Sequence, residues 1–203
     1  MRRGPDAEDA EVSSRPSLRP RGLERGRLRG SVCGDPDLKG EFVGAVAGRL
    51  QGCGIEDAVR VTSVSGIALS TGSLMNCRTA RALKAWTEDS AVPSLRRVGG
   101  GLRELRVAAH YSCRTINNQP GGRLSEHGKG SAIDISAFRL NDGTELTLLG
   151  DWNSQRGRAP MRAMFRGACG PFSTVIGPDG DRFHLDHFHF DTAQRRSGFR
   201  YCR

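Results

Sequence analysis

SEHGKGSAIDISAF (residues 125–138) and HLDHFHFD (residues 184–191) are the most informative stretches of this 203-residue sequence. The second stretch contains three of the five histidines of the chain, and the first contains His127, seven residues before Asp134. In SAIDISAF and HFHFDTA, apolar and polar residues alternate, as is typical of strands. We expect the two stretches to meet in space and to hold a metal.

The residue types and their spacing suit zinc. His187 and His189 lie two apart in a predicted strand, so their side chains point to the same face of a sheet. Two glycines between His127 and Asp134 let the backbone bend so that these side chains converge. Two histidines and one carboxylate, at about 2.0–2.2 Å from the ion and with water in the fourth position, form a catalytic zinc arrangement.

The remaining polar side chains of this region allow more than one interpretation. His184 fits a contact behind the metal ligands less well than it fits a surface histidine. His110 fits a packed histidine in a strand better than a ligand. Asp191 shares the parity of His187 and His189, so it either orients a ligand imidazole or is a plain surface carboxylate.

Composition indicates a globular, basic protein. The net charge is +9, and 28 of the 31 basic residues are arginine. The arginines are scattered without the interleaved aromatic residues that stack on bases, so no nucleic acid is expected as a partner. A basic surface of this kind suits an anionic polymer of the cell envelope.

Six cysteines, none within twenty residues of another, argue against a C-x-x-C metal or redox motif. Three disulfides in an oxidising compartment are one interpretation, with fifteen pairings open; six reduced, buried thiols in a cytosolic protein are the other. The N-terminus shows no apolar signal-peptide core, and no run is long enough to span a membrane.

The order of predicted elements favours an α+β domain. Residues 1–30 contain eight arginines and three prolines and are predicted to be a disordered basic tail or linker, with one domain over 31–203. We expect a helix over about 35–50, capped by Asp35, with Leu38, Phe42, Val46 and Leu50 as its apolar stripe. Further helices are expected at 77–89 and 159–169. Strands are expected at 58–70, 102–114, 131–138, 144–149, 172–177 and 187–193. These strands predict a small antiparallel sheet that carries the zinc site, flanked by helices and stabilised by disulfides.

The motifs also resemble known families. SEHGKGSAID fits the S-x-H-x-x-G-x-A-x-D signature of zinc D-alanyl-D-alanine carboxypeptidases, whose relatives include lysostaphin-type endopeptidases and the hedgehog domain. YSCRTINNQ (111–119) is similar to their Y-R-S-x-x-x-Q element, with Cys113 inserted before Arg114. CGPFSTVIGPDGDRFHLDHFHFD (169–191) and the terminal YCR resemble the bacterial extensin-like C-terminal family, over about residues 33–203.

The resemblance implies roles for individual residues. His127, Asp134 and His189 would bind zinc. Arg114 would face a substrate carboxylate or a developing oxyanion, and Ser125 would help to hold the substrate terminus.

Two residues compete for the role of the base. Asp186 stands where the peptidases place the acid that activates water, and His187 matches the first histidine of the H-x-H in the lysostaphin-like branch. We prefer Asp186 as the base, with His187 positioning the intermediate, provided that the strand begins after Asp186.

Three functions are compatible with the sequence. The first is a zinc peptidase or amidase acting on peptidoglycan peptides in the periplasm or cell envelope. The second is a zinc-bearing envelope module that binds without turnover. The third is a basic structural or nucleic-acid-binding protein without a metal, which a steep salt dependence of affinity would reveal. We favour the first.

Overall fold

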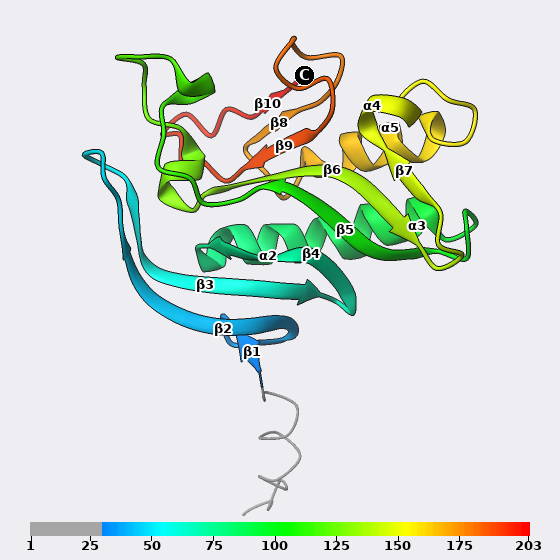
Figure 1. The fold of residues 1–203 in the computed structure, drawn as a ribbon, viewed down its shortest axis with the longest axis horizontal. Helices are drawn as coiled ribbons and strands as arrows, with labels where there is room; N and C mark the ends of the chain where they lie inside the picture. Colours follow the sequence, from blue (N-terminus) through cyan, green and yellow to red (C-terminus); the bar gives the residue numbers. More distant parts are fainter. Residues whose placement is uncertain (1–29) are drawn as a thin grey trace, which may run out of the picture.

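The computed structural model describes residues 30–203, so the predicted tail falls outside the described residues except for Gly30 (Figure 1). One sheet of ten strands runs through this part of the chain, in the order β1-β2-β3-β4-β5-β6-β9-β8-β10, with β7 paired to β6. The strands are β1 (Ser31–Val32), β2 (Asp35–Ala47), β3 (Gly54–Val64), β4 (Ile67–Met75), β5 (Leu102–Ala109), β6 (Ala132–Leu140), β7 (Glu145–Thr147), β8 (Thr174–Ile176), β9 (Phe188–Asp191) and β10 (Tyr201–Cys202).

The sheet corrects two predictions. It is large rather than small, and it is mixed, because β4 pairs with β5 and β8 pairs with β10 in parallel while the other pairs are antiparallel. The helix expected over 35–50 is wrong, since Asp35–Ala47 is strand β2. Glycines explain the difference: a Cβ on Gly40 would collide with the backbone oxygen of Arg60 on β3, and the ladder is irregular around Gly40 and Gly44.

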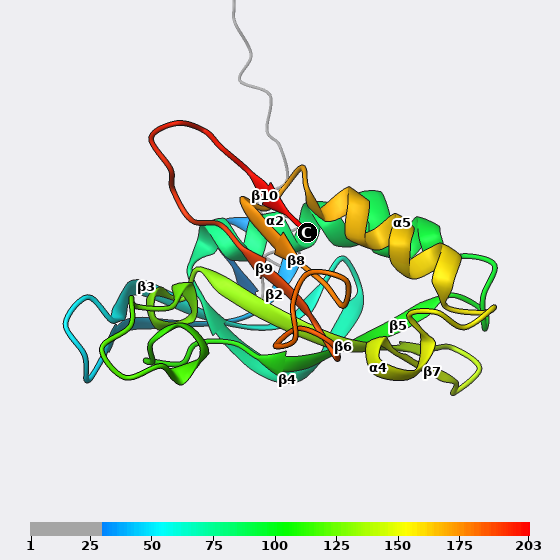
Figure 2. The same cartoon turned by 90° about the horizontal axis from the view of Figure 1, so that it is seen from above.

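Helices α2 (Cys77–Trp86) and α5 (Arg158–Ala168) lie on one side of the sheet, whereas α4 (Leu148–Asp151) lies beside β7 (Figures 1 and 2). The other helical segments are a π-turn (Thr87–Ala91), α3 (Val92–Leu95) and the 3-10 turns η2 (Ile116–Asn118) and η3 (Glu126–Lys129). The predicted helices at 77–89 and 159–169 therefore agree with α2 and α5, whereas the strand predicted at 144–149 ends at Thr147 and continues as α4. None of the described helices is long and apolar enough to cross a membrane.

α2 is capped at its start and buried at its end. The Asn76 Oδ1 atom accepts a hydrogen bond from the Thr79 amide at 2.9 Å and caps the helix. Trp86, at the other end, is fully buried, and its ring lies 4.9 Å from the ring of Phe190 on β9. The Trp86 indole donates to the Met164 carbonyl of α5 at 2.9 Å. This side chain thus joins α2, α5 and the strand that carries His189.

Three disulfides pair all six cysteines, as one of the two interpretations required. Cys33–Cys77 ties the β1–β2 turn to the start of α2, and Cys169–Cys202 ties the end of α5 to β10. Cys53–Cys113 joins the end of the β2–β3 hairpin to the segment after β5. Such bonds persist outside the reducing cytosol, so they indicate an extracytoplasmic protein.

Candidate metal centre

Two of the predicted ligands are direct neighbours across the sheet. β6 and β9 lie side by side in both views (Figures 1 and 2), and Asp134 pairs with His189 in the antiparallel register. Cross-strand partners project to the same face of a sheet, with Cβ atoms about 4.5–5.5 Å apart. The backbone ladder therefore brings this carboxylate and this imidazole together.

His127 reaches the pair from turn η3, just before β6. The Ser125 hydroxyl accepts from the His127 amide at 3.3 Å and caps the turn. Gly130 ends it in the left-handed conformation, with φ of 62°, and its carbonyl accepts from the Asn76 amide at 2.9 Å. A side chain at Gly130 would also collide with Ile55. The turn is thus fixed at its start by Ser125 and at its end by Asn76, and His127 is only 1% exposed.

The three ligand atoms form a small triangle. His127 Nε2 lies 3.2 Å from both Asp134 Oδ1 and His189 Nδ1, and the last two atoms lie 2.9 Å apart. Ligands at about 2.05 Å from a tetrahedral zinc ion are separated by about 3.3 Å. The observed triangle is close to this size, so the three residues fit zinc with small adjustments. Within the described residues, this is the cluster that could hold a metal ion.

Outer hydrogen bonds fix how both imidazoles face the triangle. The His110 carbonyl can only accept, so His127 donates from Nδ1 at 2.8 Å and turns the lone pair of Nε2 inward. Asp191 likewise accepts from His189 Nε2, at 3.4 Å, which leaves Nδ1 facing inward. Three electron-rich atoms then share one small space, and they need a cation between them, either a metal or a proton.

The electrostatics agree with a shared cation. Burial alone would raise the pKa of Asp134, but the imidazole of His189, which donates to it, and the adjacent imidazole of His127 hold that pKa far below its ordinary value. Burial favours the neutral form of His189, yet hydrogen bonds to Asp134 and Asp191 raise its pKa to about 9. In the metal-free chain the proton on His189 is therefore the cation of the triangle.

Asp186 and His187 stand beside the triangle as a pair. Asp186 precedes β9, and its side chain is 64% exposed. It accepts from His187 Nδ1 at 2.8 Å, and His187 Nε2 faces the triangle, 3.7 Å from Asp134 Oδ2. His187 is thus nearer to the triangle, and Asp186 orients it.

Two expectations about neighbouring histidines are corrected. His184 is buried rather than on the surface: its ring centroid lies 5.0 Å from that of His187, and Asp181 accepts from its Nδ1 at 2.7 Å. His110 lies just beyond β5 and is half-buried rather than in the core; its backbone oxygen, not its ring, contacts His127. Asp191 is buried and accepts from the imidazole of His189, a predicted ligand, which agrees with the first of its two interpretations.

The predicted substrate contacts lie on the segment next to η3. Arg114 is half-buried; its carbonyl accepts from the Ser125 amide at 3.0 Å, and its guanidinium lies 3.5 Å from the Thr115 carbonyl. Ser125 is buried and caps η3. The structure gives both residues local roles, and their contact with substrate stays a prediction.

Comparisons with known proteins add the family. A family model described as extensin-like protein C-terminus matches residues 43–203. No curated protein and no solved structure matches the chain. The match includes every candidate residue of the metal centre.

Proposed function

The chain belongs to the extensin-like protein C-terminus family, and from this premise we propose that it is a zinc-dependent peptidase or amidase of peptidoglycan peptides. The observation that carries the proposal is the triangle of His127, Asp134 and His189, with both imidazoles turned inward by outer partners. Two histidines and one carboxylate, with a fourth position left open, form a set of ligands found in zinc hydrolases.

The residues around the triangle suit hydrolysis. When bound, zinc would supply a Lewis acid that lowers the pKa of a water molecule toward about 7. His187 Nε2 would take up a proton in the reaction, because Asp186 orients the ring with this nitrogen toward the triangle and would stabilise the resulting imidazolium. We therefore assign the base to His187 and its orientation to Asp186, which reverses the preference drawn from the sequence.

Arg114 and Ser125 would serve the substrate. We propose that Arg114 faces a carboxylate of the peptide or the oxyanion, because a guanidinium matches such groups bidentately. Within residues 30–203 its guanidinium makes one long contact, to the Thr115 carbonyl, which leaves donors for that purpose. The Ser125 hydroxyl accepts from the backbone and can still donate its proton to a substrate terminus.

Location and partners follow from the same reasoning. The disulfides support a protein outside the reducing cytosol. We propose the periplasm or cell envelope as the compartment, and peptidoglycan peptide or another envelope polymer as the partner, with no role for nucleic acid.

One observation favours the alternative, a zinc-bearing envelope module without turnover. The side chains of His127, Asp134 and His189 are 1%, 6% and 13% exposed. Such burial would restrict the access of a polymeric substrate to an ion held there, which favours binding without turnover. The more exposed pair of His187 and Asp186 supports catalysis instead.

The test measures zinc and hydrolysis separately. Elemental mass spectrometry should find about one zinc per oxidised chain, and His189→Ala should lose it. His110→Ala is the matched control, because His110 serves His127 only through its backbone oxygen. Purified peptidoglycan is then digested with the zinc-loaded chain and with His187→Ala. Zinc without release of peptides would establish the module, and a chain that binds no added zinc would remove both functions.

A further inference from the structure

Helix α5 has two faces of different character. Met161, Met164 and Ala168 are buried against the rest of the fold. Arg158, Arg162 and Arg166 recur every fourth residue on the other side, and we call these three residues the arginine face. Successive members are separated by about 6 Å along the helix axis.

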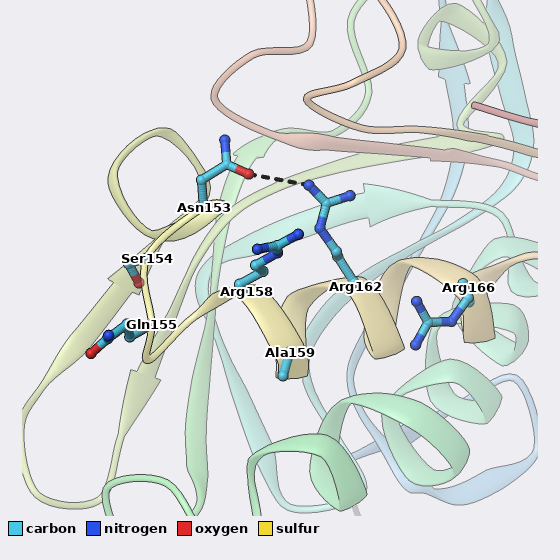
Figure 3. A pocket seen from close by; sticks show the side chains of 7 residues that line it. All are labelled: Asn153, Ser154, Gln155, Arg158, Ala159, Arg162 and Arg166. Atoms are coloured by element: carbon cyan, nitrogen blue, oxygen red, sulfur yellow. Dashed lines mark hydrogen bonds between the residues drawn. The ribbon is translucent and has the colours of Figure 1, made fainter.

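Two adjoining cavities open over the arginine face. The larger, of about 370 Å³, is lined by three arginines and by neutral side chains of the preceding loop and helix, with no carboxylate. The smaller, of about 230 Å³, shares Arg162 and Arg166 with it. Figure 3 shows Arg158 and Arg162 extending from successive turns toward the loop of Asn153, with Arg166 further along α5.

The positive charge of this face is only partly compensated. Arg162 donates to Asp179 Oδ2 at 2.7 Å and to Asn153 Oδ1 at 3.2 Å, and it lies over the Trp152 ring. Arg158 and Arg166 are exposed and have no carboxylate partner among residues 30–203. Three arginines and one aspartate leave a net charge of two on this face.

The arrangement is unfavourable for the helix itself. Like charges four residues apart repel each other. α5 also begins at Arg158, after an N-cap residue, Gly157, that has no side chain to cap it, and its first turn holds no acidic residue, so Arg158 adds to the positive end of the helix dipole. Asp179 compensates Arg162, but no carboxylate among residues 30–203 pairs with Arg158 or Arg166, and an anion bound along the face would compensate both.

We propose that the arginine face binds a linear phosphate-bearing polymer that runs along α5. Arginine matches phosphate bidentately, and two adjoining cavities along one helix suit a chain rather than a single ion. The larger cavity has no aromatic lining on which a base could stack. Trp152, Phe165 and Asp179 also line the smaller cavity, where Arg162 lies over the Trp152 ring and is bonded to Asp179. The larger cavity also has none of the large exposed apolar side chains that would insert into a membrane. The site is separate from the metal centre and does not depend on it.

The experiment compares two charge-matched variants of the full chain. Arg158→Gln with Arg166→Gln removes the two unpaired members and leaves Arg162, which is bonded to Asp179, in place. Arg49→Gln with Arg103→Gln removes two exposed arginines on other elements. The basic residues 1–29 remain in every protein, so their contribution cancels.

Binding of polyglycerol phosphate is measured by calorimetry at several salt concentrations. The Arg158/Arg166 variant should bind about tenfold more weakly or worse, with the slope of log K against log salt reduced by about 1.4, while the control variant keeps most of its affinity. Equal losses in both variants would overturn the proposal, as would absence of binding at low salt. Stronger binding to single-stranded DNA, or binding only to phosphatidylglycerol vesicles, would also overturn it.

Discussion

Protons and zinc should compete for His189, and the structure sets the size of the effect. Zinc needs a neutral imidazole, so its binding releases the proton that His189 carries in the metal-free chain. With a pKa of about 9, the neutral fraction of His189 is about 0.001 at pH 6 and about 0.09 at pH 8. The affinity for zinc should therefore rise about 90-fold across this range. A histidine of ordinary pKa would give a rise of only about fourfold.

The measurement is a zinc titration against a chromophoric chelator whose own affinity is calibrated at each pH. Asp191→Asn tests the cause, because it removes one of the carboxylates that raise the pKa of His189. This variant should show a smaller rise with pH and about 10–100-fold weaker binding at high pH. Asp142→Asn, at an exposed position, is the control. A rise below about fivefold in the unmodified chain would refute the reasoning, because His189 would then be neutral before zinc binds.

Three further predictions concern stability and turnover. In the chelator-treated chain, the raised pKa of His189 stabilises the fold fully below pH 6.5, and this contribution is lost as the pH rises through about 9. Denaturant unfolding should show that the free energy of unfolding decreases by up to about 3 kcal/mol across this range. The same decrease in a His189→Ala chain would contradict this. Replacing both Cys53 and Cys113 by alanine opens the bridge with a sequence separation of 60, which should lower the free energy of unfolding by about 4 kcal/mol in the same assay; an unchanged midpoint would argue against it. Asp186→Asn should keep its zinc but slow peptidoglycan hydrolysis by about 10–100-fold, and undiminished hydrolysis would remove Asp186 from the site.

Most helices and strands could be predicted from local patterns, and β2 shows why one could not. Leu38, Phe42 and Val46 are spaced four apart, which fits one face of a helix and equally one face of a strand. Gly40 and Gly44 weaken a helix, and they would have been the better guide. The size of the sheet and its two parallel pairs depend on long-range pairing, for which the sequence carries no local signal.

The candidate site was partly predictable for a similar reason. The sequence and its family resemblance named the ligands, and the structure groups His127, Asp134 and His189 within one triangle. The partner of His187 could not be foreseen, because alternation along a strand does not describe Asp186, which lies before β9. His184 was placed on the surface because its burial depends on a turn in which Asp181 holds the ring.

The metal centre depends on the correct alignment of β9 with β6, because Asp134 and His189 pair across these two strands. A slip of β9 by one residue against β6 would turn His189 to the opposite face and put Phe188 or Phe190 beside Asp134. Chains that fold with the wrong alignment would then lack the His189 nitrogen, one of the three inward-facing atoms. Binding of a metal would thus select correctly aligned chains from misaligned ones during maturation.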